Sequence, residues 1–320
     1  MATIDVFNGD ADGLCALHQL RLANPQDNML ITGVKRDISL VKQVQATSSD
    51  QVTVLDVSLD KNRDALIKVL ETGASVTYAD HHFPGDIPEH ANLTTHIDTA
   101  AETCTGLIVN GLLKGAHLAW AVTAAFGDNL LVNARQAAAP LNLSAEDLDK
   151  LMTLGTLLNY NGYGSSLEDL FFAPADLYRR IQPHSDPLTF INEDAAFTTL
   201  KQGFASDHTR ATSIEAARST ESIAIFQFPN DPFARRISGV YANELAQQHP
   251  DRAHALLSEL DDGSYLVSVR APLNNRTGAD ELCRQFETGG GRKAAAGINQ
   301  LPAGDVDRFA QAMSEQFKRS

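Results

Sequence analysis

Carboxylate and imidazole side chains, the groups that bind metal ions and move protons, follow three short apolar runs in the N-terminal half of the chain. Carboxylates that crowd together repel one another unless a cation lies between them. Oxygen-rich sites with an imidazole suit Mn²⁺ or Mg²⁺ better than Zn²⁺. Two such ions roughly 3.5–4 Å apart form a clamp for phosphoryl transfer, so the pattern predicts a dinuclear metal hydrolase. The side chains are Asp10 and Asp12 in NGDADG, Asp56 in VLDVS, Asp80, His81 and His82 in ADHH, and Asp128 in AFGDN, which follows an Ala-rich helix.

The elements that must position these side chains are strands separated by helices. The apolar runs 3–7, 52–55 and 75–78 are typical of short strands, and 13–22 and 61–72 have the apolar spacing of helices. This alternation predicts βαβ units and a parallel sheet with helices on both faces. Ligands bind beyond the carboxyl ends of such strands, so we expect the acidic and imidazole groups to meet at one sheet edge.

Each group also has an ordinary structural interpretation when it is taken alone. NGDADG fits an Asp-Gly turn with an acidic helix N-cap, and an Asp-His pair fits the polar start of a loop. The metal-site prediction therefore depends on the combination of the groups and on the sheet that brings them together.

The second half of the chain contains a helical stretch and then another alternating section. Residues 102–158 are mainly helical in pattern, and 162–192 are expected to form helices and loops. We predict two α/β domains, 1–195 with a helical connector and 196–320, joined near residue 200. The elements predicted in the second domain are strands at 223–226, 255–257 and 265–269 and helices at 236–249, 280–286 and 306–317.

Composition limits the classes of function. The chain has 320 residues, 43% hydrophobic and 21% charged, and a formal charge of −14, which disfavours binding of long duplex nucleic acid. Its three cysteines form no C-x-x-C pair, as suits a reducing cytoplasm. We found neither a signal-peptide pattern nor an apolar run long enough to cross a membrane. The sequence therefore predicts a cytoplasmic protein without a membrane partner.

The motifs NGDADG, VLDVS, ADHH and AFGDN, in this order, resemble those of the DHH phosphoesterase family, which includes RecJ-like exonucleases and nanoRNases. GGGRKAAAG at 289–297 resembles the GGGH-x-x-A-A-G signature of the smaller domain that accompanies DHH domains, and VSVR at 267–270 resembles its strand with a substrate-binding arginine. The resemblance covers nearly the whole chain. It implies an α/β fold with an N-terminal parallel-sheet DHH domain, flanking helices, a smaller C-terminal α/β domain, and an active site in the cleft between them.

The resemblance also implies roles for individual residues. Asp10 would bind one metal ion and Asp12 the second, Asp56 would bridge both, and His81 and Asp128 would complete the second site. The expected catalytic residues are Asp56, Asp80, which orients a histidine, and His82, which faces the substrate phosphate as a proton or hydrogen-bond donor. The expected substrate-binding residues are Arg270, Gly290, Gly291, Arg292 and Lys293.

The sequence departs from the family pattern at two places. Val6 stands where many members have a metal-binding histidine, and Asn8 stands where RecJ-like members have an aspartate. Asn8 can offer a carbonyl oxygen to a metal but brings no charge. Arg292 replaces the usual histidine of the glycine-rich signature, which favours phosphate binding over proton donation. GGGRKAAAG alone also fits a flexible turn before an Ala-rich helix, and its phosphate-binding interpretation uses the N–H groups of that helix N-terminus.

The function implied is a Mn²⁺-dependent phosphoesterase with two ions, for which Mg²⁺ or Co²⁺ can substitute. Its substrate would be a dinucleotide, a short oligonucleotide or a nucleotide bisphosphate, attacked by metal-activated water. Two alternatives stay open, namely a nucleotide-binding or sensor protein of the same fold with weakened catalysis, and a polyphosphate or pyrophosphate phosphohydrolase. The resemblance also suggests a homodimer.

Overall fold

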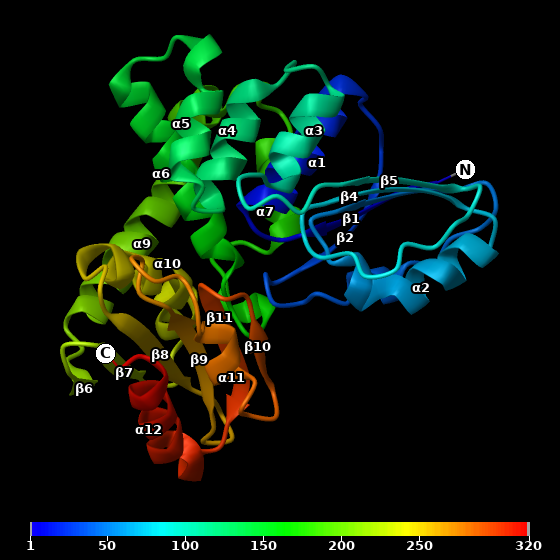
Figure 1. Cartoon of the computed structure of the whole chain (residues 1–320). Helices are drawn as coiled ribbons and strands as arrows, with labels where there is room; N and C mark the ends of the chain where they lie inside the picture. The colour runs from blue at the N-terminus through cyan, green and yellow to red at the C-terminus, as the bar shows by residue number, and fades with distance from the viewer. Residues whose placement is uncertain (1, 319–320) are drawn as a thin grey trace. The chain divides into compact units, whose positions relative to one another are not determined.

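The protein is described by a computed structural model over residues 2–318. Its internal contacts divide the chain into two compact units, Met1–Gln202 and Gly203–Ser320, and each has its own β-sheet (Figure 1). Helix α9 (Ala195–Thr212) contains the division. Within the described residues, no helix combines the length and the apolar character needed to span a membrane.

Unit 1 contains a five-stranded, fully parallel sheet in the order β2-β1-β3-β4-β5. The three predicted strands are confirmed as β1, β3 and β4. The outer strands β2 and β5 are additions that the sequence analysis did not identify. The strands are β1 (Thr3–Asn8), β2 (Met29–Gly33), β3 (Gln51–Leu55), β4 (Ser75–Asp80) and β5 (Leu93–Ile97).

Helices cover both faces of this sheet. Val6 of β1 packs in an apolar core that includes Leu66 and Leu70 of α2 (Leu59–Glu71). The neighbouring Asp5 points to the opposite face, where it pairs with Arg21 of α1 (Ala11–Ala23). The predicted layers, with a parallel sheet between helices, are therefore confirmed.

The helical stretch expected from 102–158 is confirmed and continues to the end of unit 1. Figure 1 shows these helices grouped at one side of unit 1, next to α1. They are α3 (Thr105–Leu112), α4 (Leu118–Gly127), α5 (Leu131–Ala137), α6 (Ala145–Gly162), α7 (Pro174–Ile181) and α8 (Pro187–Glu193), with the short 3₁₀ turns η2 (Ala139–Leu141) and η3 (Leu167–Asp169). A further 3₁₀ turn, η1 (Leu40–Gln43), lies between β2 and β3 and contacts α2.

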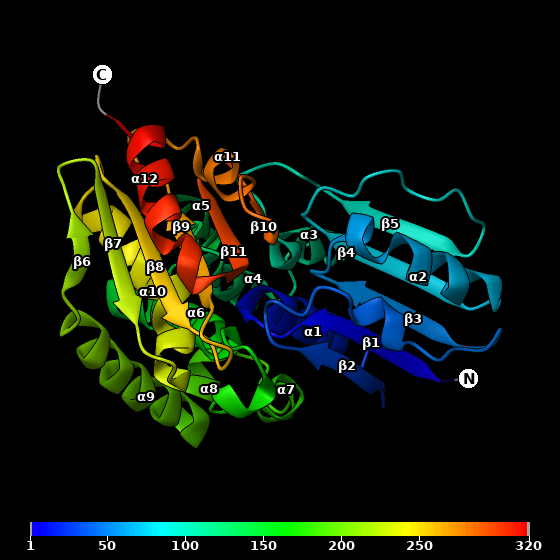
Figure 2. The same ribbon diagram turned by 90° about the horizontal axis from the view of Figure 1, so that it is seen from below.

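Unit 2 contains a six-stranded mixed sheet in the order β10-β11-β9-β8-β7-β6. One face packs on α11 (Ala279–Cys283) and α12 (Val306–Gln316), and the other on α10 (Pro232–Gln248), which Figure 2 shows on either side of the strands. The strands are β6 (Ala216–Ser219), β7 (Ile223–Phe228), β8 (Ala253–Glu259), β9 (Tyr265–Arg270), β10 (Gly289–Gly291) and β11 (Ala295–Leu301), and a 3₁₀ turn, η4 (Ala303–Asp305), precedes α12.

Two local predictions in unit 2 were wrong. The helix predicted at 280–286 ends at Cys283, and the glycine-rich segment does not begin a helix. Instead β10 and β11 form an antiparallel hairpin, in which Gly291 lies opposite Ala296. Ala296 also pairs with Val269 of β9, so the ladder hydrogen bonds of a sheet outweigh the helical preference of the alanines.

Candidate metal centre

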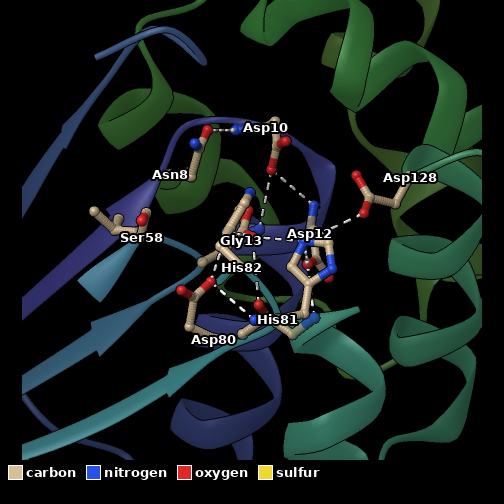
Figure 3. Close-up of polar contacts among 12 residues, drawn as sticks. Asn8, Asp10, Asp12, Gly13, Ser58, Asp80, His81, His82 and Asp128 are labelled. Atoms are coloured by element: carbon tan, nitrogen blue, oxygen red, sulfur yellow. Dashed lines mark hydrogen bonds and ion pairs between the residues drawn. The ribbon is translucent and has the colours of Figure 1, made fainter. Parts of the chain in front are cut away.

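The acidic and imidazole side chains predicted to form a site converge at the carboxyl edge of the unit 1 sheet (Figure 3). The ligand atoms of Asp12, His81 and Asp128 all lie within 4.8 Å of one another. Those of Asp56, His81 and His82 satisfy the same limit. The two groups share His81, so they form one continuous cluster. Its residues lie at the ends of β3, β4 and α4 and in the first turn of α1.

Asp10 ends the turn between β1 and α1 and caps the helix. Its Oδ1 accepts hydrogen bonds from the backbone N–H groups of Asp12 at 3.0 Å and Gly13 at 3.1 Å. A side chain at Gly13 would not fit, since a Cβ there would lie 2.2 Å from the carbonyl oxygen of Asn8. The Asp-x-Asp-Gly spacing thus caps the helix, as one interpretation of the sequence predicted, and places both carboxylates in the cluster, whereas metal binding by them stays a prediction.

Asp12 is held by the N-terminus of α3. Its Oδ2 accepts a hydrogen bond from the N–H of Thr105, and its Oδ1 one from the N–H of Gly106, both at 2.7 Å. The positive end of the helix dipole favours a carboxylate at this position. Asp12 is buried, so these two hydrogen bonds fix the direction of its carboxylate.

Asp56 lies directly after β3 in a left-handed backbone conformation with φ of 57°. Such a conformation costs an L-residue about 1–3 kcal/mol, and aspartate and asparagine tolerate it better than most residues. The N–H of Asp56 still bonds to the carbonyl of Ala79 at 3.1 Å, and its Oδ1 accepts from the hydroxyl of Thr105 at 3.3 Å. This turn at the end of the strand directs the carboxylate into the cluster.

His81 lies at the centre of the cluster. Its Nε2 is 3.5 Å from Oδ1 of Asp56, 3.5 Å from Oδ2 of Asp128 and 4.0 Å from Oδ2 of Asp12. These separations are longer than hydrogen bonds and fit groups that surround a common point.

Asp128 reaches the cluster because α4 packs very closely on its neighbours. A Cβ on Gly127 would lie 2.3 Å from the Cβ of Ala11 in α1 and 2.9 Å from the carbonyl oxygen of Gly155 in α6. Only glycine permits this approach, and Asp128 follows directly at the end of the helix.

Asp80 and His82 form a pair at the end of β4. Oδ1 of the fully buried Asp80 lies 2.7 Å from Nδ1 of His82 and accepts the N–H of His81 at 2.9 Å. His82 is the most exposed of the cluster's histidines and aspartates, with 34% of its side chain accessible. Asp80 therefore sets the orientation of an imidazole that reaches solvent.

Lys35 is a member of the cluster that the sequence analysis missed. It follows β2, and its Nζ lies 2.5 Å from Oδ2 of Asp10, 2.8 Å from Oδ1 of Asn159 and 3.8 Å from Oδ1 of Asp128. Asn8 lies beside this ion pair, where its Oδ1 accepts the N–H of Asp10 and its amide donates to the carbonyl of Lys35, both at 3.3 Å.

The charges in the cluster are not balanced by the side chains alone. Burial raises the pKa of Asp56 well above its ordinary value, and the charges of Asp10, Asp12 and Asp128 raise it further. Burial and the charge of Asp128 also raise the pKa of Asp12. At Asp10 burial acts in the same direction, but the ammonium of Lys35 outweighs it and the pKa falls below its ordinary value. A divalent cation among Asp12, Asp56, His81 and Asp128 would relieve this repulsion, and their oxygen and imidazole donors suit Mn²⁺ or Mg²⁺.

The predicted substrate-binding residues lie together at one end of the unit 2 sheet. Arg270 ends β9, opposite Ala295 of β11, and its Nε donates to Oδ1 of Asn243 at 2.6 Å. Arg292 and Ala295 exchange backbone hydrogen bonds of 2.9 and 3.1 Å that close the β10–β11 turn. Arg292 and Lys293 are exposed in this turn, next to Gly290 and Gly291 of β10.

A sequence profile described as the DHHA1 domain matches residues 222–319, most of unit 2. No curated protein matches the chain in sequence.

Among solved structures, the pGpG-specific phosphodiesterase PggH of Vibrio cholerae aligns over 99% of both chains, with a TM-score of 0.57 and 14% identity. The exonuclease RecJ bound to manganese aligns over 99% of this chain and 90% of its own, with a TM-score of 0.54 and 18% identity. RecJ from Thermus thermophilus, in complex with Mn²⁺, aligns over 98% of this chain but 51% of its own, with a TM-score of 0.58 and 18% identity.

The described chain therefore has the fold of RecJ and PggH, and residues 222–319 match the DHHA1 domain. The fold class predicted from the sequence is confirmed, and so is the resemblance of the C-terminal region to the domain that accompanies DHH domains. At these identities the structural matches establish the fold and leave the activity to be inferred from the site.

Proposed function

We propose that this protein is a divalent-metal-dependent phosphoesterase that hydrolyses a small nucleotide substrate. The observation that carries the proposal is the position of His81 at the edge of the sheet, where its Nε2 lies 3.5–4.0 Å from carboxylate oxygens of Asp12, Asp56 and Asp128. Buried carboxylates with raised pKa values and a shared imidazole are an arrangement that a divalent cation stabilises.

These four side chains would hold the ion, and Mn²⁺ is the ion we propose because RecJ structures of the same fold contain it. When bound, the ion supplies a water of lowered pKa and neutralises charge on the phosphoryl oxygens. Thr105 and Gly106 keep Asp12 directed at the ion through their N–H groups.

The pair formed by Asp80 and His82 would handle the proton of the leaving group. Attack of water on phosphorus would release one water proton to solvent and break the P–O ester bond, so that the departing oxygen would need a proton. A protonated His82 can donate it, since Asp80 bonds to its Nδ1 and stabilises the charged imidazole.

A nucleotide is favoured over an inorganic substrate by the surface next to this pair. Phe83 follows His82 directly, and 74% of this aromatic side chain is exposed. Exposed aromatic rings stack on nucleobases and contribute about 1–3 kcal/mol per base. PggH, which has the same fold, is specific for pGpG. We therefore propose a linear dinucleotide or a comparably short nucleotide.

The test is product release from a substrate panel with and without Mn²⁺. The panel contains a linear dinucleotide, a cyclic dinucleotide, a nucleoside 3′,5′-bisphosphate, pyrophosphate and polyphosphate. We expect Mn²⁺-dependent turnover of one nucleotide class, lost in Asp56→Asn and retained in Asp64→Asn, an exposed residue of α2 outside the cluster.

Other results would redirect the proposal. Turnover of pyrophosphate or polyphosphate alone would support the inorganic alternative. Tight nucleotide binding with no turnover, in protein shown to contain Mn²⁺, would support the sensor alternative. Equal turnover by wild type and Asp56→Asn would remove the proposed mechanism. The homodimer, the cytoplasmic location and the domain division at residue 195 stay predictions.

A further inference from the structure

A cation already occupies part of the cluster. The ammonium of Lys35 lies 2.5 Å from Oδ2 of Asp10 and 3.8 Å from Oδ1 of Asp128. Asp128 thus faces Lys35 through one carboxylate oxygen and His81, at 3.5 Å, through the other. The cluster contains two positions for positive charge, one among Asp12, Asp56, His81 and Asp128, and one between Asp10 and Asp128.

At the second position, both carboxylate oxygens of Asp10 already accept hydrogen bonds. Oδ1 of Asp10 caps α1 through the N–H groups of Asp12 and Gly13, and its Oδ2 binds Lys35. A divalent ion on Asp10 would have to replace the ammonium or break the helix cap. Both changes would expose buried charge or leave buried donors without acceptors, which costs free energy.

Val6 and Asn8, which stand where family members have a further metal ligand, do not supply one here. Val6 is apolar and packs in the core on the α2 side of the sheet. Asn8 uses its Oδ1 on the N–H of Asp10 and its amide on the carbonyl of Lys35. Asn8 therefore supports the Lys35–Asp10 pair. A metal site at this position would instead need an additional carboxylate or imidazole.

Lys35 is anchored in place from several directions. Its backbone N–H donates to the carbonyl of Gly162 at 2.8 Å, and its Nζ donates to Oδ1 of Asn159 at 2.8 Å. The ammonium also lies 5.4 Å from the centre of the Tyr163 ring, within cation–π range. With 24% of its side chain exposed, Lys35 is part of the centre and differs from a surface lysine.

We propose that the Lys35 ammonium takes the place of one of the two divalent ions expected from the sequence. The centre then binds a single Mn²⁺ through Asp12, Asp56, His81 and Asp128, while Lys35 neutralises Asp10. This inference rests on the proposed metal-dependent function and deepens it. Lys35 is a positioning residue, because its ammonium acts through Asp10 and Asp128 of the cluster.

The experiment is a count of bound Mn²⁺. Wild type, Lys35→Ala and Lys42→Ala are titrated by calorimetry, and the loaded proteins are examined by native mass spectrometry and electron paramagnetic resonance. Lys42 is an exposed lysine of η1 and serves as the matched control. Wild type and Lys42→Ala should bind one ion and give the six-line spectrum of isolated Mn²⁺. Lys35→Ala, in which Asp10 is released, should bind a second, weaker ion and show spin coupling between the two.

Two results would overturn the inference. The first is two spin-coupled ions in the wild type. The second is a single ion in a folded Lys35→Ala variant, because Lys35 would then not be what excludes the second ion. If circular dichroism shows that this variant does not fold, the number of Mn²⁺ ions bound by the wild type alone decides whether the inference holds. These outcomes differ from failure of the proposed function, since two bound ions would leave a metal-dependent phosphoesterase intact, whereas no bound ion would refute both.

Discussion

Asp56→Asn should have opposite effects on the metal-free and the metal-loaded protein. Burial and four neighbouring carboxylates raise the pKa of Asp56 well above its usual value. Because its pKa is raised in the folded state, Asp56 stabilises the folded protein at a pH below its unfolded-state pKa of 3.8. This stabilisation is lost as the pH rises through the folded-state pKa. At neutral pH the Asp56 carboxyl therefore destabilises the metal-free protein. Asparagine removes the charge and tolerates the left-handed backbone at this position.

The size of both effects follows from linkage. Mn²⁺ at about 100 times its dissociation constant stabilises the folded state by about 2.7 kcal/mol. In a unit of the size of Met1–Gln202, a change of about 1 kcal/mol in the free energy of unfolding shifts Tm by roughly 2–4 °C. Wild type should thus gain about 5–11 °C in Tm from Mn²⁺. Asp56→Asn should gain less than about 1 °C, and its metal-free Tm should exceed that of wild type by about 2–4 °C.

The assay is thermal unfolding at pH 7, in chelator and in Mn²⁺, with Asp64→Asn as the control for loss of a carboxylate outside the cluster. The control variant should gain as much in Tm from Mn²⁺ as the wild type does. A metal-free Asp56→Asn protein that melts below wild type would refute the reasoning about crowded carboxylates. A variant that keeps the full gain from Mn²⁺ would show that Asp56 is not a ligand.

Three further predictions concern the proton-donating pair, the substrate and the pH. Asp80→Asn should lower kcat by about 10–100-fold with little change in Mn²⁺ affinity, because Asp80 orients His82. An equal loss of Mn²⁺ affinity, measured by calorimetry, would instead show that Asp80 takes part in metal binding. Phe83→Ala should weaken binding of a dinucleotide by about 1 kcal/mol or more and leave metal affinity unchanged, and an unchanged KM would exclude stacking on this ring. Mn²⁺ affinity should rise from pH 5 to pH 8 with release of protons, since Asp12 and Asp56 have raised pKa values, and a flat calorimetric profile would contradict this.

Much of the fold was predictable because local patterns and the tertiary structure agree. The runs at 3–7, 52–55 and 75–78 each contain β-branched or aromatic residues, and each became a strand of the parallel sheet. The same agreement failed at 289–297, where alanines that favour a helix when isolated belong to β11 and pair with β9. The pairing partner lies far away in the sequence, so local propensity cannot reveal it.

The sequence by itself determined which ligand types reach the sheet edge. Asp12, Asp56 and His81 each follow a strand, and the ends of parallel strands must meet. What only the tertiary structure decided is how the charges are shared among them. Lys35 enters the cluster from the end of β2, a strand without a strong pattern of its own, and reaches Asp10 across 25 positions. Coulomb interactions depend on distance in space, so the pairing of Asp10 with Lys35 could be found only from the tertiary structure.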